Sequence, residues 1–405
     1  MENDNTIGQR VRRRRRSIGM TQKVLGELVG RSEDWVRSFE GGRRGTPKLP
    51  LLLAVAEALG LSDLADLTGN GHAVSVEIFA GRRHPDLANV QAALTEFRVG
   101  ASGGRHSVAH LAERLRCAWE IRHSSPDHRT QLGALLPDLI RDAQAAARTP
   151  GEDRREARRV LAGVYGLADF FVAYQADPAL VWMVADRALE QAYEADDPYL
   201  IACASWGMVQ ALRDTGRWDE ALGMIASSTE LLAPYVERDE TPDDWRGITG
   251  ALHAEAALVH GRRGRHGDAW AAWERADQWA QLLGPDYRHV QTSFSQAIQG
   301  ANGVTLGVEL RRSGEALRAA RAVEPDAIVS VPRRSRHLIE VARAYDQRDE
   351  DAAVLAHLDK AYRTAPETIS YNGYARDLLL KLRHNPPDGM AKDVRELCER
   401  VGVAA

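Results

Sequence analysis

The feature that most constrains the fold is a pair of short helix patterns joined by a tight turn at Gly30-Arg31. Thr21 is a favourable N-cap for the first helix, and Ser32 caps the second, which runs over residues 33–40. Glycine tolerates a left-handed backbone, so Gly30 can end the first helix and Gly41-Gly42 can end the second. The pattern predicts two helices joined by a turn, and such a motif can present the start of its second helix to the major groove of DNA.

Five short helices are expected between Ile7 and Leu67. The first ends at Gly19 and is expected to bury a thin apolar face made by Ile7, Val11 and Ile18. The two helices of the turn motif are expected to point a small set of apolar side chains inward: Val24, Leu25, Leu28, Val29, Val36 and Phe39.

Residues 21–44 resemble, position for position, the lambda-repressor-like (Xre) family of DNA-binding domains. Residues 51–62 look like the fourth helix of that family and the cap of its fifth helix. The resemblance covers roughly residues 7–68. It implies an all-α, five-helix DNA-binding domain over residues 1–68, with a double-stranded DNA operator as its partner.

The resemblance also implies which residues contact DNA. Gln22 would touch phosphate and brace the second helix of the motif, here called the recognition helix, while Arg43 and Arg44 would hold phosphates just beyond it. The other DNA-binding positions lie at the cap and on the exposed face of the recognition helix: Ser32, Glu33, Asp34, Arg37 and Ser38. The last four fall where the family reads base edges.

Arg15 and Glu40 match a buried ion pair that locks the first helix to the third in members of this family. We therefore interpret this pair as structural, and expect the loss of either side chain to destabilise the domain.

The family more commonly has neutral polar residues where this chain has Glu33 and Asp34. If these carboxylates face bases, they can accept a hydrogen bond from cytosine N4, which would favour C·G pairs. Alternatively, they stabilise the positive N-terminal end of the helix and stay clear of the bases. Trp35 is similarly open between the core, a sugar-phosphate contact and packing on another part of the chain, and the core is the commonest place for such a residue.

The arginine run over residues 12–16 also has two interpretations. It can be a stripe that follows the phosphates, or a solvated helix face with one buried member, Arg15. Successive helical residues cannot all face one DNA backbone, so we expect one or two of the run to touch DNA.

Charge is distributed unevenly along the chain. The first fifty residues hold 12 Lys+Arg and 6 Asp+Glu, a charge of +6, whereas residues 51–405 carry −10. A basic head on an acidic body is typical of a small anion-binding module on a larger domain. Arginine supplies 48 of the 53 cations in the whole chain. Its abundance alone therefore does not indicate an anion-binding site, whereas the position of particular arginines can.

Residues 69–104 are expected to form a linker with one helix over 86–97, and residues 105–405 a long series of amphipathic helices. No convincing strand pattern occurs. Small residues recur in the triplets centred on Ala188, Ala221, Ala269, Ala316 and Ala352, at intervals of 33, 48, 47 and 36 residues. The first interval is close to the 34-residue tetratricopeptide period, so we expect a tetratricopeptide-like α-solenoid with small residues at helix starts.

This second region resembles tetratricopeptide-type sensor domains, and the whole layout resembles Xre regulators of the actinobacterial type. Residues 308–317, 338–345 and 365–367 look like the C-terminal signature of that group. Phe294-Ser295-Gln296-Ala297-Ile298 departs from the Phe-Gly-Pro-Thr-Asn segment common in those relatives, which leaves a shared ligand in doubt. The wider group includes regulators that bind short peptides in the concave groove, so a peptide or small-molecule effector is implied.

Candidate groove residues follow from one helix and three positions placed on later helices. Trp206, Gln210 and Arg213 share a face of the helix over residues 199–214, and the later candidates are His253, His289 and Gln291. Most are expected to be packing or solvated positions, because aromatic stripes at helical spacing usually belong to a core.

No motif for enzyme chemistry is recognisable, and no cofactor or metal is implied. Cys117, Cys203 and Cys398 are too scattered for a disulfide framework or a metal site, which fits a reducing cytoplasm. The histidines lack ligand spacing, no stretch is apolar enough to span a membrane, and no signal peptide is recognisable.

Together these patterns predict a sequence-specific DNA-binding transcriptional regulator whose solenoid senses an effector and dimerises. The alternative is an interaction scaffold whose solenoid binds a partner protein, with DNA binding secondary.

Overall fold

The computed structural model of this protein describes residues 6–43, 47, 49–61, 65–68, 83–96, 107–173, 175 and 177–403. The chain divides into two compact units, one covering the described residues up to Thr68 and the other running from Arg83 to Val403. All regular secondary structure in these ranges is helical, so the all-α prediction is confirmed.

The first unit consists of short helices around one small core. They are α1 (Ile7–Ser17), α2 (Gln22–Leu28), α3 (Glu33–Glu40), α4 (Leu49–Ala58) and α5 (Ala65–Thr68). The core is made of buried apolar side chains from these helices and from the residues that cap α2 and α4: Val11, Leu25, Val29, Val36, Phe39, Leu52, Val55, Ala56, Leu59 and Leu67. None of these helices has more than 11 residues, and isolated helices of that length are marginal in water, so each depends on packing against the others.

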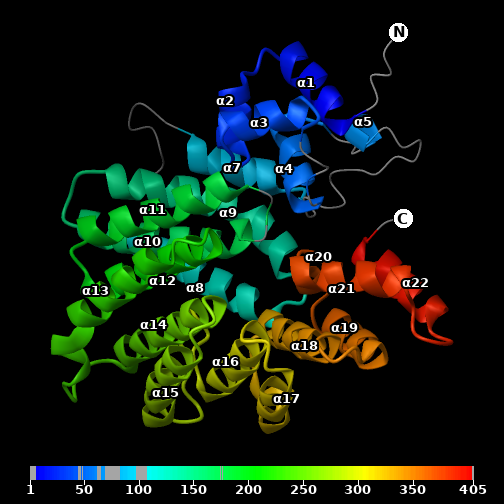
Figure 1. Ribbon diagram of the computed structural model, residues 1–405. Coiled ribbons are helices and arrows are strands. Elements are labelled where there is room, and N and C mark those ends of the chain that lie inside the picture. The colour runs from blue at the N-terminus through cyan, green and yellow to red at the C-terminus, as the bar shows by residue number, and fades with distance from the viewer. Residues whose placement is uncertain are drawn as a thin grey trace. The chain divides into compact units, whose positions relative to one another are not determined.

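The second unit begins with α7 (Leu87–Thr95) and continues as antiparallel helix pairs, which follow one another in Figure 1. The pairs are α8 (Val108–Ser124) with α9 (His128–Arg148), α10 (Arg154–Val172) with α11 (Pro178–Glu194), α12 (Pro198–Asp214) with α13 (Trp218–Val236), α14 (Asp243–Arg262) with α15 (His266–Leu283), α16 (Gln296–Glu309) with α17 (Ser313–Ala322), and α18 (Val331–Asp346) with α19 (Asp351–Thr364). A 3-10 turn, η1 (Pro325–Ala327), precedes α18. The chain ends with α20 (Pro366–Ser370), α21 (Gly373–His384) and α22 (Ala391–Val401).

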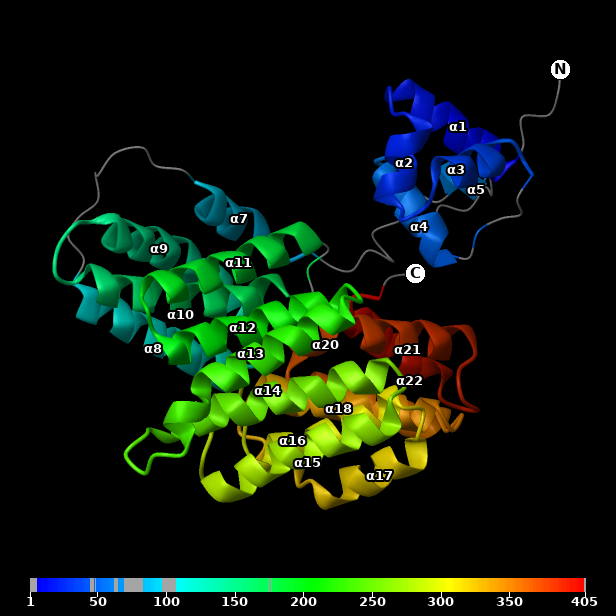
Figure 2. The same cartoon turned by 60° about the vertical axis from the view of Figure 1, so that its left-hand side comes forward.

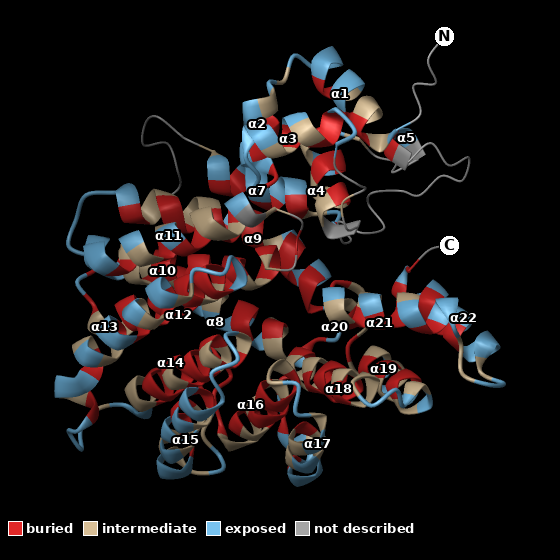
Figure 3. Ribbon diagram, viewed as in Figure 1, coloured by how far each residue is buried: buried red, intermediate tan, exposed pale blue. Residues whose placement is uncertain are grey.

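The pairs form an α-solenoid whose inner row closes on itself. The even-numbered helices from α8 to α18 contact one another in order, and α18 also contacts α8. The second view shows the pairs stacked side by side (Figure 2). The inner helices α14, α16 and α18 are buried over most of their length, whereas α15 and α17 keep an exposed outer face (Figure 3). Burial on the inner row is what a closed solenoid requires, because each pair covers the apolar face left by its neighbour.

The small residues of the repeat lie in the second helix of each pair. Ala221, Ala269 and Ala316 are fully buried near the starts of α13, α15 and α17. A Cβ atom on Gly307 of α16 would lie 2.7 Å from the backbone nitrogen of Ala316, so α16 and α17 touch through their backbones. The prediction that small residues mark helix starts is wrong in one place, because Ala188 lies in the middle of α11.

The helix expected in the linker over residues 86–97 spans Leu87–Thr95 and starts after the N-cap residue Asp86. It belongs to the second compact unit, where Leu87, Val90 and Leu94 are buried in the core that α9 and α10 also build. This helix is therefore the first helix of the larger unit, and the described boundary between the units falls before Arg83.

Candidate functional site

The turn between α2 and α3 has the geometry that its sequence predicts. Thr21 accepts a hydrogen bond from the Val24 N–H at 3.1 Å, and Ser32 accepts one from the Trp35 N–H at 3.2 Å. Gly30 has a φ of 63°, which favours glycine. A Cβ on Gly26 would lie 2.6 Å from the carbonyl oxygen of residue 31, so the turn can pass this close to α2 only over a glycine.

The predicted pair of Arg15 and Glu40 is present and buried. The Arg15 Nε atom lies 2.6 Å from Oε1 of Glu40 and Nη2 lies 2.9 Å from Oε2, so the contact is bidentate. The hydrogen bond to Glu40 raises the pKa of Arg15. Arg15 also donates to the Met20 carbonyl oxygen at 2.6 Å. These contacts fix α1, the turn after it and the end of α3 in one arrangement.

Gln22 joins this network from the start of α2. Its Nε2 atom donates to Oε2 of Glu40 at 2.8 Å, so Gln22 is placed where it can brace the recognition helix α3. Its side chain is half-buried, which leaves part of it accessible to a phosphate. Glu40 thus receives three hydrogen bonds from two neighbouring helices.

The exposed start of α3 carries its own charge cluster. Arg37 donates to Oδ1 of Asp34 at 2.6 Å and to Oε1 of Glu33 at 2.7 Å. All three side chains are exposed, Asp34 by 85%. Exposed ion pairs contribute little to stability, so DNA can replace them at small cost. The two carboxylates orient Arg37, a role that the sequence-based interpretations did not include.

The other predicted DNA-binding positions on and near α3 are also accessible. Ser32 is exposed, Ser38 is half-buried and Arg43 is exposed just after α3, where its N–H donates to the Ser38 carbonyl oxygen at 3.0 Å. Arg44 lies outside the described residues. Trp35 is half-buried and packs against Phe39 with ring centroids 5.2 Å apart, so it belongs partly to the core.

Several arginines of α1 have structural partners. Arg10 donates to the carbonyl oxygen of Leu67 at 3.0 Å, and Arg14 donates to that of Leu59 at 3.1 Å. These carbonyls lie at or next to the C-terminal ends of α5 and α4, where a cation is favourable. Within the run over residues 12–16, Arg14 and Arg15 therefore hold the domain together, while Arg12 and Arg16 are exposed and remain available for phosphate.

Three apolar residues expected inside the first unit lie on its surface. Ile18 is 42% exposed, Val24 42% and Leu28 60%. Helical periodicity placed them with the core, but the domain covers only the side of α2 that carries Leu25, which leaves Val24 and Leu28 exposed, and Ile18 lies in the C-cap of α1 beyond the last helical turn. The predicted burial of these three side chains is wrong.

In the second unit, residues 284–295, here called the central segment, contact the inner helix row, with residues 289 and 292–295 buried and residues 285, 286, 288 and 290 exposed. This segment is non-helical, and His289 and Phe294 within it are almost completely buried. His123 of α8 lies 2.7 Å from the Val290 carbonyl oxygen, and Arg333 of α18 donates to the Thr292 carbonyl oxygen at 3.2 Å. The central segment therefore joins α8 and α18, which are neighbours where the inner helix row closes.

Two groove candidates belong to the central segment and not to a helix, which corrects the prediction for them. The Gln291 Nε2 atom donates to the Cys203 carbonyl oxygen of α12 at 3.0 Å. His289 accepts the Thr292 N–H at Nδ1, so its Nε2 carries the proton and donates to the Tyr199 hydroxyl at 3.0 Å. Burial lowers the pKa of His289 to about 4, so its imidazole is neutral at pH 7.

The four helical candidates are not brought together as one open groove. Trp206 is buried against Phe170 of α10, and Arg213 forms a buried ion pair with Glu255 of α14. Gln210 is half-buried on α12. His253 is half-buried on α14, and burial together with the charge of Arg275 lowers its pKa to about 4. Sequence reasoning missed the central segment, whose only signal was the long 47-residue interval between Ala269 and Ala316.

The described residues contain neither a membrane-spanning helix nor a metal cluster. No helix there is long and apolar enough to cross a membrane. No group of three or more His, Cys, Asp or Glu side chains in these ranges could hold a metal ion.

Comparison with known proteins identifies the first unit. Residues 6–68 match the family model for a helix-turn-helix domain, so the N-terminal part of the chain is a helix-turn-helix domain. No curated protein matched the chain.

Two solved structures show a remote likeness. One is PlcR of Bacillus thuringiensis in complex with the peptide PapR7 and DNA, at 12% identity and a TM-score of 0.30, covering 88% of this chain and 99% of that one. The other is the apo form of the competence regulator ComR of Streptococcus vestibularis, at 15% identity and a TM-score of 0.26, covering 74% of this chain and 99% of that one.

Proposed function

We propose that this protein is a sequence-specific DNA-binding transcriptional regulator that inserts α3 into the major groove of its operator. One observation carries the proposal. The exposed start of α3 is held on a helix-turn-helix domain by the buried network of Arg15, Glu40 and Gln22. Such a lock presents Glu33, Asp34, Arg37 and Ser38 in a fixed geometry, which direct readout of base edges requires.

Phosphate binding is assigned to Gln22, Arg43 and Arg44. Phosphate contacts set the register on DNA but carry no sequence information, so their loss weakens binding to every sequence alike. Replacement of Arg43 by alanine is expected to lower affinity for operator and random DNA by the same factor and to reduce the salt slope by about 1. Arg321→Ala is the matched control, because Arg321 is exposed on α17 and lies outside the helix-turn-helix domain.

The decisive experiment is selection of bound fragments from genomic DNA with the full chain and with a chain that lacks residues 1–68. A recurring sequence that disappears with the truncation supports the proposal. Two-fold symmetry in that sequence supports the homodimer that we propose as the active form, because half-site spacing mirrors the symmetry of the protein. Enrichment of no sequence by the full chain contradicts sequence-specific binding.

We further propose that the second unit senses a peptide or small-molecule effector. A ligand can change DNA affinity only by its preference for one of two conformations. A ligand that enters the solenoid interior has to displace the central segment from His123, Tyr199 and Arg333. Operator release on addition of an effector, measured by fluorescence anisotropy, tests this step.

One observation favours the second candidate, a scaffold for a partner protein with secondary DNA binding. Glu33 and Asp34 outweigh the single charge of Arg37 at the start of α3, and a net negative charge there disfavours DNA. Under this alternative, a partner protein stays bound after residues 1–68 are deleted and no operator is selected.

A further inference from the structure

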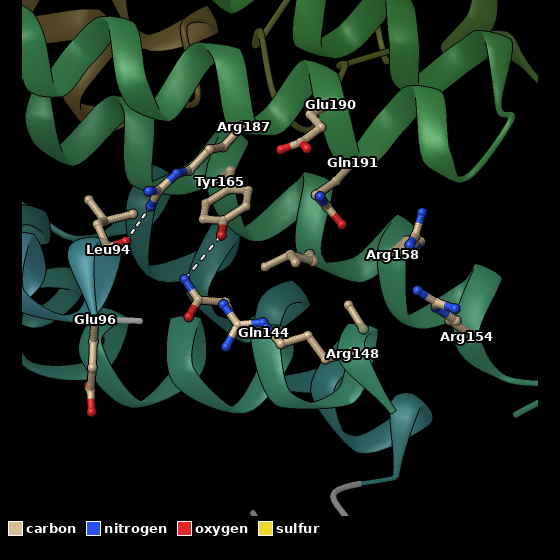
Figure 4. A pocket seen from close by; sticks show the side chains of 12 residues that line it. Leu94, Glu96, Gln144, Arg148, Arg154, Arg158, Tyr165, Arg187, Glu190 and Gln191 are labelled. Carbon is tan, nitrogen blue, oxygen red and sulfur yellow. Dashed lines mark hydrogen bonds between the residues drawn. The ribbon is translucent and has the colours of Figure 1, made fainter. Parts of the chain in front are cut away.

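A cavity of about 240 Å³ opens between α7, α9, α10 and α11 of the second unit (Figure 4). Arginines from three different helices line it: Arg148 at the end of α9, Arg154 and Arg158 on α10, and Arg187 on α11. All residues that line this cavity belong to the second unit, and none of them belongs to the central segment. Neither the family resemblance nor the proposed DNA contacts involve it.

Two of these arginines already have partners. Arg158 forms an ion pair with Glu194, and Arg187 donates to the carbonyl oxygen of Leu94 at the end of α7. Arg148 and Arg154, by contrast, form no hydrogen bond or ion pair through their side chains with any residue that the structure describes. Two guanidinium groups at the mouth of the cavity are therefore available to an anion.

Negative charge around the cavity does not neutralise these two arginines. Glu96 is paired with Arg141 at 2.9 Å, and in Figure 4 its carboxylate points away from the other lining side chains. Glu190 is the other lining carboxylate. The cavity wall thus has an excess of positive charge, although residues 51–405 as a whole carry −10.

The floor of the cavity offers a directed hydrogen-bond donor. The Gln144 Nε2 atom donates to the Tyr165 hydroxyl at 3.0 Å, and both side chains are more than nine-tenths buried. Since the hydroxyl oxygen accepts this bond, its own proton is free to donate, and no described residue accepts it. Burial raises the pKa of Tyr165, which keeps this proton in place at neutral pH.

Helix α10 adds to the positive potential. Arg154 is its first residue, and the N-cap Asp153 makes no side-chain hydrogen bond to the first turn. The N–H groups at the start of a long helix favour an anion.

A second cavity, of about 260 Å³, shows that this arrangement is not simply a result of the high arginine content. Two of its lining cations are occupied, because Lys381 binds Asp346 at 2.7 Å and Arg343 binds Glu340 at 2.6 Å, and only Arg311 lacks a partner among the described residues. The first cavity differs because two of its arginines are unpaired within the described part of the chain.

We propose that the cavity between α7, α9, α10 and α11 binds a small phosphate ester. A phosphate monoester carries between one and two negative charges near neutral pH and offers several oxygens, which matches two free guanidinium forks and a hydroxyl donor. The volume has room for about eight water-sized groups at ~30 Å³ each, enough for a phosphate and a short organic part. Leu94, Ala147 and Leu161 supply apolar contacts for that part. The inference goes beyond the proposed function, since binding at this site needs no DNA.

Isothermal titration of the full chain with inorganic phosphate and with glycerol phosphate tests the site. We expect saturable binding of both, and tighter binding of glycerol phosphate. The double variant Arg148→Gln/Arg154→Gln is expected to weaken binding by about tenfold or more, because charge-assisted hydrogen bonds of this kind contribute at least that factor. Glu190→Gln is expected to strengthen binding a few-fold by removing a repulsive charge.

The matched control is Arg321→Gln/Arg395→Gln, which removes two exposed arginines of α17 and α22 that also lack partners among the described residues. Its affinity for glycerol phosphate should stay within twofold of the original. Absence of saturable binding overturns the proposal. Equal loss in the control variant overturns the assigned location, and tighter binding of succinate than of glycerol phosphate overturns the phosphate assignment. Circular dichroism of each variant verifies that the helices are retained.

Discussion

Each unit of the protein buries a carboxylate, but the two carboxylates are held in opposite ways. Glu40 of the helix-turn-helix domain is 2% exposed and receives hydrogen bonds from Arg15 and Gln22. Asp169 of the solenoid is 8% exposed, and its Oδ1 atom has no hydrogen-bond partner among the described residues. Burial raises the pKa of Asp169 to about 7, with a further contribution from the charge of Asp214.

The difference shows that partners, and not burial, decide whether an ionised carboxylate supports a fold. A buried carboxylate without a partner costs free energy when it is ionised, so it tends to take up a proton. A buried carboxylate that is paired carries this cost only when its partner is removed and the charge is left unpaired. Opposite signs are therefore expected when the two carboxylates are replaced.

The largest effect is expected for Glu40→Ala. This change leaves Arg15 charged and buried without its carboxylate, which costs about 3–5 kcal/mol. That loss approaches the whole stability of a small domain. Amide hydrogen exchange of α1 and α3 in the full chain measures it, since protection reports local stability.

Glu33→Ala is the control for Glu40→Ala, because Glu33 also binds an arginine but is exposed. Its effect on exchange in α1 and α3 should stay within about 0.5 kcal/mol. Similar losses in both variants would contradict the structural role of the buried network.

The next effect is expected for Asp169→Asn, and it depends on pH. In the unfolded chain this aspartate loses its proton near the ordinary pKa of 3.8, while the folded group keeps it up to about 7. The folded state thus binds more protons between these values, and the free energy of unfolding falls as pH rises through this window. Asparagine does not titrate, so the free energy of unfolding of the variant should lack this dependence on pH. The variant should therefore be more stable than the original protein at pH 8 by up to about 4 kcal/mol, with little difference at pH 4.

Urea unfolding at pH 4, 6 and 8 tests the prediction for Asp169. Asp286→Asn serves as the control, because Asp286 is exposed in the central segment and its replacement should not change the pH dependence. A variant at Asp169 that is less stable at pH 8 would show that the carboxylate has a favourable partner when ionised.

A third carboxylate lies between these extremes. Glu367 of α20 accepts the N–H groups of Arg129 and Thr130 at 2.6 and 3.2 Å, and so caps the first turn of α9. Glu367→Ala is expected to cost about 1–2 kcal/mol, as the loss of an N-cap does. Hydrogen exchange in the first turn of α9 should rise, while α14 stays protected. Glu367→Gln keeps an acceptor oxygen and should recover part of the loss.

Sequence reasoning succeeded where a feature depends on a few neighbouring residues. The caps at Thr21 and Ser32 and the glycine at position 30 are local signals, and the structure confirms each of them. The pair of Arg15 and Glu40 is a contact over 25 residues, which the family resemblance supplied and periodicity could not.

It failed where the answer depends on distant parts of the chain. Whether Leu28 is covered depends on how many helices a small domain can place around α2. The role of Arg14 at the end of α4 is a contact over 45 residues. His289 and Gln291 were assigned to helices because composition alone does not distinguish a buried non-helical segment from a helix, and only the surrounding ring of helices makes this segment stable.

The smallest effect on stability is expected for Asp34→Ala, which removes the most exposed of the compared carboxylates. The ion pair with Arg37 is worth at most about 1 kcal/mol to the fold. The variant should nevertheless change base preference, because Asp34 lies at the start of α3 and accepts a hydrogen bond from Nη1 of Arg37 at 2.6 Å, which orients that guanidinium. We expect discrimination at one base-pair step to shift by about 1 kcal/mol, roughly fivefold. Competition binding with single-step variants of the selected operator measures the shift. A uniform change on all sequences, like that expected for Arg43→Ala, would instead assign Asp34 to the helix N-terminus alone and leave base readout to Arg37 and Ser38.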